Sequence, residues 1–445
     1  MKYNPELNGT KLSIPLKDQK LAIVAIIIIV GLAGSSFYHY LLGVHYHLGF
    51  PFNTFLFKPQ DRFNDFFNNY RQITLTGSGI FTIGHELINY IYYFISLIPF
   101  HTDVTAYLFY AEIFLEYLFF YNYLNIKNYE YARSTGFEII IYSIIFTFFT
   151  YPVLFSIDRG NREMYIFMIM SLSIFFYYNK KYFVSAILLG LAVHAKIYFA
   201  IFLLIYFSDR KYKEIAIVIF LFIVSPLLAL VIDKWLLPAV QFTGSGFVFL
   251  KTAASSDNFY NQIYVLGDDG AGFCSSLYGA LKAIIYLIFP NIQAGSLPIQ
   301  HLFSFYLPVA AFFAGIIALY VILIEKERWR KVTLVTLSLI LFPYVTGDYR
   351  LIILFIPLWM FMNSKRISKH DITFAILFGL LLIPKDYYII RDSISISVIL
   401  NPLLIIIFMI LLVHEGLETW KEQNSRISIL YPFGIRPKNK RVKTG

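Results

Sequence analysis

Apolar segments close to the length of a membrane-spanning helix recur along this chain of 445 residues, and they constrain its fold more than any other feature. A helix needs about 20 predominantly apolar residues to cross a bilayer, and the runs 21–42, 104–124 and 301–324 meet that length. Charged residues make up only 14% of the chain, against about 25% in a soluble globular protein. The sequence therefore predicts an all-α, polytopic integral membrane protein.

The basic residues predict the orientation of these helices. The chain has 37 Lys and Arg against 27 Asp and Glu, and most of the positive charge lies in short loops between apolar runs. Such loops face the cytoplasm. The pattern predicts about 12 spans, within a range of 10 to 13, and cytoplasmic N- and C-termini. We expect residues 1–413 to form one transmembrane domain, with the first run as a retained helix and not a cleaved signal peptide.

Three stretches of the chain, two loops and the C-terminal tail, are not expected to cross the membrane. The first outer loop, 43–103, and the second large outer loop, 233–300, each contain an apolar piece that is too short to span, at 87–100 and 277–289. We expect both pieces to lie along the outer membrane interface. The basic tail 414–445 is expected to meet anionic lipid headgroups in the cytoplasm, and no nucleic-acid partner is expected.

Several basic residues depart from this inside bias and lie at predicted outer helix ends or in outer turns. They are Arg62, Arg71, Arg159, Arg162, Lys196 and Arg350. Charges at membrane depth are costly and are functional candidates by default. The arginine fork binds two phosphate oxygens at once. We therefore expect Arg159, Arg162, Lys196 and Arg350 to bind a phosphate, the alternative being side chains that only reach for lipid headgroups.

Two carboxylates in the first outer loop are candidates for a general base. Asp61 and Asp65 are four residues apart and would share one face of a helix. Asp61 follows Pro59-Gln60, where a helix would begin, so a helix-start role fits it. This favours Asp65 as the base, with Asp61 orienting it or pairing with Arg62. Arg62 is also a candidate substrate-binding residue. The alternative is a solvated loop whose charged residues take no part in catalysis.

Other motifs limit the chemistry. His194 lies next to a predicted outer end and is a candidate for binding a substrate hydroxyl, although a satisfied buried histidine is an equal alternative. No P-loop and no GxGxxG occurs, so ATP-driven transport and nucleotide cofactors lack support. The single cysteine, Cys274, excludes a disulfide within the chain. No cofactor is expected.

The chain resembles the GT-C superfamily of membrane glycosyltransferases, and most closely its bacterial branch of polyprenyl-phosphate-mannose-dependent mannosyltransferases. The resemblance is carried by Asn64-Asp65-Phe66-Phe67-Asn68-Asn69-Tyr70 after the first helix, Gly160-Asn161 before the fourth span, Lys196, and Asp348-Tyr349-Arg350. It implies a GT-C-like fold and transfer of a sugar from a polyprenyl-phosphate donor to an extracytoplasmic glycan or glycolipid. It further implies Asp65 as the base, Asn161 and Tyr349 as substrate-binding residues, and no divalent metal, since cationic side chains bear the phosphate charge.

Two alternatives stay open. An O-antigen or capsule polymerase would also use outer arginines, but would place them in two large outer loops. A polytopic transporter or lipid flippase would show charges within its spans.

Overall fold

The helices follow the apolar runs of the sequence. A computed structural model describes residues 16–76, 86–128, 135–236, 261–268, 271–366 and 368–430. Over these ranges the chain is predominantly helical. The first half contains α1 (Leu16–Tyr40), η1 (Leu41–His45), η2 (Pro59–Asp61), α2 (Asn64–Thr76), α3 (Glu86–Ser96), α4 (Asp103–Lys127), α5 (Gly136–Phe148), α6 (Tyr151–Arg159), α7 (Glu163–Tyr178), α8 (Tyr182–Ala195), η3 (Ile197–Phe202), α9 (Leu203–Ser208) and α10 (Tyr212–Leu236).

The second half continues in the same way. It contains η4 (Asn261–Leu266), η5 (Ala271–Phe273), α12 (Leu277–Ile288), α13 (Leu297–Leu323), α14 (Arg328–Leu341), η6 (Asp348–Leu354), α15 (Phe355–Met362), α16 (Asp371–Leu381) and α17 (Ser397–Leu430). Two short antiparallel strands, β1 (Ile389–Arg391) and β2 (Ile394–Ser395), pair between α16 and α17. The predicted basic tail beyond residue 430 and the centre of the second outer loop, 237–260, lie outside the described residues.

Within the described residues, four helices are long and apolar enough to cross a bilayer, at Gln19–His45, Asp103–Lys127, Leu297–Leu323 and Ser397–Glu422. A fifth span is counted if α5 and α6, which meet at an angle of 49°, form one broken span. The predicted number of about 12 is therefore not confirmed, while several helices compatible with a membrane protein are present. The predicted span from Gly136 to Phe155 is interrupted, because Pro152 begins a new helix and cannot donate to the previous turn.

Several other predicted spans are divided into short helices. The run after Lys196 becomes η3 and α9, and the run after Gly347 becomes η6 and α15. A 3₁₀ turn rises more per residue than an α-helix, so the 15 residues of η6 and α15 still extend roughly 26 Å. Both α3 and α12 are too short to span, having 11 and 12 residues. Their predicted place at the outer interface stays a prediction.

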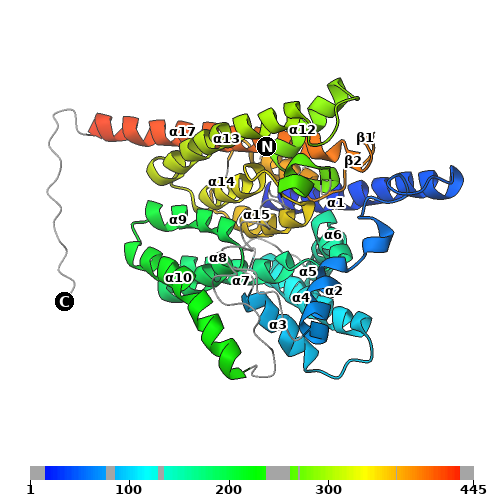
Figure 1. The fold of residues 1–445 in the computed structure, drawn as a ribbon. Coiled ribbons are helices and arrows are strands. Elements are labelled where there is room, and N and C mark those ends of the chain that lie inside the picture. The colour runs from blue at the N-terminus through cyan, green and yellow to red at the C-terminus, as the bar shows by residue number, and fades with distance from the viewer. Residues whose placement is uncertain are drawn as a thin grey trace, which may run out of the picture.

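The core is built around α14 and the η6–α15 segment. Every residue of α14 from Trp329 to Leu341 is buried, and so are Leu351 to Trp359. Figure 1 shows α13, α14 and α17 on one side of α15, and α3, α4, α7, α8 and α10 on the other. α8 packs between α7 and α10, and α1 packs on α16. α15 is apolar all round, as expected of a helix that lies inside such an assembly.

The polar clusters divide between two ends of the bundle. α7 begins at Glu163, and near its other end Tyr177 donates to Asp209, which also pairs with Lys331 in the first turn of α14. α14 returns from Lys331 toward the turn before Arg350. With 16 residues, α7 is roughly 24 Å long. We call the end that carries Glu163 and Arg350 the site end, and the end that carries Asp209 and Lys331 the opposite end.

Candidate functional site

Asp65 lies in the first turn of α2, where the helix dipole favours a negative charge. Its carboxylate accepts from Arg159 Nη2 at 2.5 Å on Oδ1 and from Asn161 Nδ2 at 2.6 Å on Oδ2. The guanidinium of Arg159 lies 4.1 Å from the ring centre of Phe57. The side chain of Asp65 stays 27% exposed. The structure thus holds this carboxylate in one orientation while leaving it accessible.

The turn between α6 and α7 brings these partners to Asp65. Gly160 caps α6 in the left-handed region, with φ of 67°. A Cβ at this position would lie 2.8 Å from Cβ of Phe66 and 3.2 Å from Cε2 of Tyr107. Glycine therefore provides both the positive φ and the close approach of α2 to the turn. The backbone N–H of Phe63 donates to the carbonyl of Asp158 at 2.7 Å and fixes the start of α2 from the other side.

Asp158 is a second, buried carboxylate of this turn. It accepts from the N–H of Phe57 at 3.3 Å and pairs with Nε of Arg62 at 3.3 Å. Arg62 is 52% exposed, and Asp158 is 6% exposed. Asp158 thus holds the 57–62 segment against α6. Arg62, which the sequence placed among the substrate-binding residues, has Asp158 as its partner in this structure.

Lys196 and Arg350 meet at a second carboxylate, Glu163, the first residue of α7. Lys196 Nζ lies 2.6 Å from Oε1 of Glu163, and Arg350 Nε lies 3.6 Å from the same oxygen. Tyr198 also donates to Oε1. Glu163 is completely buried, and both cations are largely buried. We call Glu163, Lys196, Tyr198 and Arg350 the cation pocket.

Positive charge exceeds negative charge in the cation pocket. The pKa of Lys196 is lowered to about 8, mainly by burial; Glu163 opposes this lowering, and the charges of Arg162 and Arg350 add to it. Burial alone would raise the pKa of Glu163, but Lys196 and Arg350 outweigh it and hold that pKa below its ordinary value. One carboxylate therefore faces two cations directly, with a third charge on Arg162. A buried excess of positive charge is suited to an anion.

The turn that carries Arg350 is anchored by Asp348. Asp348 is fully buried and accepts from the hydroxyls of Tyr151 at 2.9 Å and Ser275 at 2.5 Å. Arg350 itself donates from Nη1 to Thr346 Oγ1 at 3.1 Å, and its guanidinium lies 3.9 Å from the ring centre of Tyr198. Contacts from α6, from the segment before α12 and from η3 therefore fix the position of the Arg350 side chain.

The structure brings together most of the residues that the sequence singled out. Asp65, Arg159 and Asn161 form one group, in which Arg159 binds the candidate base and not the cation pocket. Tyr349 joins Lys196 and Arg350, since its ring centre lies 5.7 Å from Lys196 Nζ. His194 is buried in the last turn of α8, and Asp61 contributes its backbone carbonyl to Arg159 at 3.4 Å.

Asn161 connects the two groups. Its Nδ2 donates to Asp65, while its Oδ1 accepts from the backbone N–H of Glu163 at 2.9 Å. One amide side chain therefore connects the carboxylate of the candidate base to the backbone of Glu163, at the start of α7. The sequence had suggested Asn161 as a substrate-binding residue, and here it also aligns the two groups.

Sequence reasoning missed Glu163, Tyr198 and the holding role of Asp158. Glu163 stands beside Arg162 in a dense polar turn, but an acidic residue is not expected among residues predicted to bind a phosphate. Electrostatic repulsion between the predicted cations could have indicated it. Several cations buried together repel one another, so a buried carboxylate should accompany them.

In chemical terms, the site end combines an oriented, accessible carboxylate with a buried cationic pocket. Comparisons with protein families, with curated proteins and with solved structures find no match to this chain.

Proposed function

We propose that this chain is an integral membrane glycosyltransferase of the GT-C type. It transfers a sugar from a polyprenyl-phosphate donor to a glycan or glycolipid acceptor, and the site end faces the extracytoplasmic side. The observation that carries the proposal is the link from Asp65 through Asn161 to the cation pocket. An apolar bundle beside this site is consistent with a lipid-linked donor, whose polyprenyl chain stays in the membrane.

The proposed roles follow from the chemistry of the transfer. An acceptor hydroxyl is a weak nucleophile, and Asp65 takes its proton as the oxygen bonds to the anomeric carbon. The bond between that carbon and the phosphate oxygen breaks, and its electron pair leaves with the lipid phosphate. That anion needs positive charge and not a proton donor. Lys196, Arg350 and Arg162 supply this charge, and Arg159 keeps Asp65 oriented.

A transfer assay with the purified full chain in proteoliposomes tests the proposal. The probes are radiolabelled polyprenyl-phosphate mannose and glucose, with membrane glycolipid extract as the acceptor. We expect label to move from the lipid donor to the acceptor in the wild-type chain and not in Asp65→Asn. Asp61→Asn is the matched control and should retain transfer.

Three outcomes would contradict the proposal. Movement of intact donor across the bilayer without transfer would identify a flippase or transporter. Extension of diphosphate-linked repeat units, with no use of a monophosphate donor, would identify a polymerase. Equal transfer by Asp65→Asn and wild type would remove the proposed base.

A further inference from the structure

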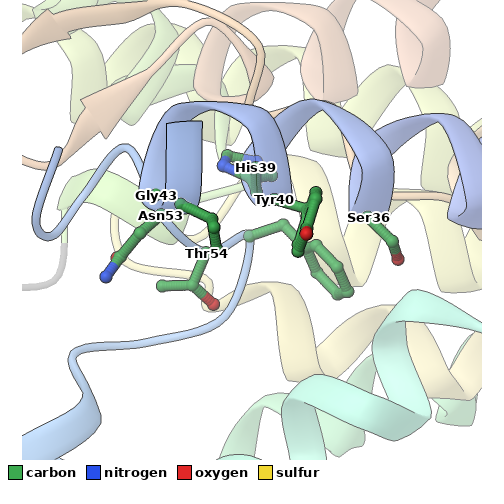
Figure 2. Close-up of a pocket in the computed structure, with 8 residues that line it drawn as sticks. Ser36, His39, Tyr40, Gly43, Asn53 and Thr54 are labelled. Atoms are coloured by element: carbon green, nitrogen blue, oxygen red, sulfur yellow. The ribbon is translucent and has the colours of Figure 1, made fainter. Parts of the chain in front are cut away.

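A cavity of about 430 Å³ lies outside the candidate site, between the C-terminal end of α1 with η1 and the segment 53–55 (Figure 2). Ser36, His39, Tyr40 and Gly43 contribute from the helix, and Asn53, Thr54 and Phe55 from the segment. No acidic or basic side chain other than the histidine lines it. The cavity therefore offers neutral hydrogen-bonding groups and two aromatic rings.

His39 is one of the residues that line this cavity. Its Nδ1 lies 2.7 Å from the carbonyl oxygen of Phe52, and because a carbonyl only accepts, Nδ1 carries the proton. In the neutral ring Nε2 is then an acceptor. The side chain is 3% exposed, and Nε2 has no hydrogen-bond partner among the described residues. Nε2 is closed to a water-sized molecule, so the imidazole forms part of the cavity wall without offering this acceptor to a ligand.

The other lining groups supply the hydrogen-bonding capacity of the cavity. Thr54 Oγ1 accepts from the N–H of Leu56 at 3.0 Å and keeps its own hydrogen to donate. The amide of Asn53 both donates and accepts. Tyr40, Val44 and Phe55 add apolar surface to the lining. Hydroxyls that donate and accept, combined with C–H faces and no charge, are the properties of a sugar.

The backbone shapes the cavity through a close contact. A Cβ on Gly43 would lie 2.8 Å from Cβ of Asn53 and 3.4 Å from its Cα. Only glycine at position 43 allows the 53–55 segment to approach the helix this closely. The lining residues are thus brought together by a specific sequence requirement and not by a loose surface loop.

The same segment leads directly to the candidate base. From Asn53 the chain reaches Phe57 in four residues, a distance of at most about 14 Å. Phe57 stacks under Arg159, the partner of Asp65. The segment that lines the cavity therefore continues to the residues that hold Asp65.

We propose that this cavity binds a neutral sugar unit of an oligosaccharide acceptor, distal to the hydroxyl that reacts. The identification of that sugar as part of the acceptor rests on the proposed transferase function. Binding of a sugar by the cavity does not.

The experiment is saturation-transfer NMR of the full chain in lipid nanodiscs, with the neutral trisaccharides mannotriose, maltotriose and triacetylchitotriose as probes. We expect at least one trisaccharide to bind to the wild-type chain. Thr54→Val and Asn53→Leu should each weaken it roughly tenfold, as expected for the loss of one hydrogen bond in a partly buried site. Gly43→Val should abolish it by separating the segment from the helix. Ser304→Ala, an exposed hydroxyl on α13, is the matched control.

The outcomes separate this inference from the proposed function. Trisaccharide binding that is lost in the cavity variants but kept in Lys196→Met supports the cavity, whether or not transfer is detected. If the wild-type chain binds the probes but transfers no sugar, the transferase proposal fails while the cavity assignment stands. No binding of any probe to the wild-type chain, or unchanged binding in Thr54→Val, Asn53→Leu and Gly43→Val, overturns the assignment.

Discussion

At the scale of single residues, the two carboxylates of the 43–103 loop differ in their partners. Asp65 accepts from two side chains of the α6–α7 turn, whereas Asp61 meets that turn through its backbone carbonyl. A general base contributes roughly 10²–10⁴-fold to rate. We expect Asp65→Asn to lower kcat by that factor, with donor affinity retained because the cation pocket is untouched. Single-turnover transfer and donor binding, measured on the same preparation, check this expectation. Loss of activity in Asp61→Asn alone would reverse the assignment.

The cation pocket makes a prediction about pH. Burial lowers the pKa of Lys196 to about 8, so in the free protein Lys196 loses its proton as pH rises through that value. A bound phosphodiester favours the protonated lysine. Donor affinity should therefore be highest below pH 8 and should fall above it by up to about tenfold per pH unit. Donor binding measured from pH 6.5 to pH 9.5 tests this, over roughly one and a half units on either side of the Lys196 pKa.

Lys196→Arg is the informative variant for that experiment, because a guanidinium keeps its charge throughout the range. Its donor affinity should be independent of pH. A pH profile identical to that of the wild type would assign the titration to another group. Lys196→Met combined with Glu163→Gln removes the titrating lysine without leaving a buried carboxylate short of a partner, and it leaves the net charge of the cation pocket unchanged. This variant should remain folded, and its donor affinity should no longer change as pH rises through 8.

At the scale of elements, the α6–α7 turn determines how α2 meets the rest of the bundle. Gly160→Ala adds a side chain at φ of 67° and places its Cβ 2.8 Å from Phe66. The left-handed conformation alone costs roughly 1–2 kcal/mol, and the contact with α2 adds to it. We expect a lower thermal midpoint and weaker transfer, since Asp65 moves with α2. Differential scanning fluorimetry and the transfer assay measure both effects.

Gly295 provides the matched control for this substitution. It also has a positive φ, of 73°, but a Cβ there meets nothing within 4 Å. Gly295→Ala should therefore show the conformational cost without the clash, and should retain transfer. Equal midpoints and equal transfer rates in the two variants would show that the approach of α2 to Gly160 is unimportant.

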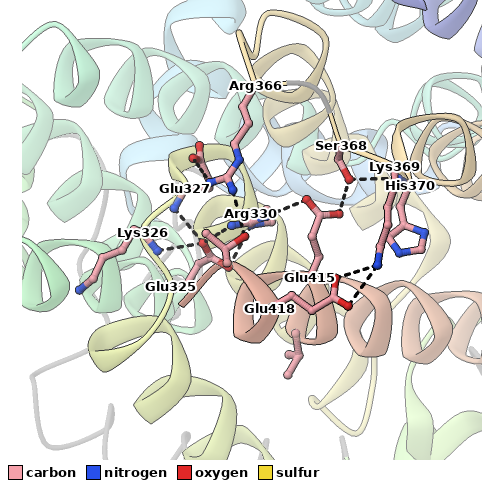
Figure 3. A network of polar contacts seen from close by, with 12 residues as sticks. Glu325, Lys326, Glu327, Arg330, Arg366, Ser368, Lys369, His370, Glu415 and Glu418 are labelled. Carbon is pink, nitrogen blue, oxygen red and sulfur yellow. Dashed lines mark hydrogen bonds and ion pairs between the residues drawn. The ribbon is translucent and has the colours of Figure 1, made fainter. Parts of the chain in front are cut away.

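At the scale of the whole molecule, the opposite end is held by a buried ionic network (Figure 3). Arg330 is 1% exposed and pairs with Glu325 at 3.1 Å and with Glu415 at 2.8 Å. Breaking a buried pair by removing one partner costs about 3–5 kcal/mol, because a buried charge is left uncompensated. Arg330→Met should therefore lower the thermal midpoint strongly. Below that midpoint donor affinity should stay unchanged, because the cation pocket lies at the site end.

Lys369→Ala is the control for that variant. Lys369 pairs with Glu418 in the same region of the structure, but both side chains are exposed. Exposed pairs contribute little, so the thermal midpoint should not change measurably. A loss as large as that of Arg330→Met would contradict a network whose stability depends on burial.

The orientation of the bundle is tested by labelling single cysteines in a Cys274→Ala background. Arg62 at the site end and Lys369 at the opposite end are both exposed. We expect Arg62→Cys to react with impermeant maleimide only from outside, and Lys369→Cys only from the cytoplasm. Reaction of both from one side would contradict a bundle that crosses the membrane between its two ends. The reversed pattern would place Asp65 in the cytoplasm.

The sequence by itself determined which segments are helical and which charges stand at helix ends. Both properties are local. In lipid an apolar run must satisfy its own backbone hydrogen bonds, which a helix does, and a charged side chain is costly within hydrocarbon. The predicted limits of the second span, 104–124, fall within three residues of α4 (Asp103–Lys127). The choice of Lys196 and Arg350 as members of one site was also made from sequence, and the structure places both against Glu163.

Only the tertiary structure decided which side chains are partners. Arg159 meets Asp65 across 94 residues of chain, and Lys196 meets Glu163 across 33. Such pairs depend on how α2, α7 and α8 pack, and a hydropathy pattern contains no information about that register. The breaks within the predicted spans could not be predicted from the sequence, for a related reason. Length and hydropathy cannot tell a continuous α-helix from an apolar run that bends at Pro152 or tightens into the 3₁₀ turns of η3 and η6.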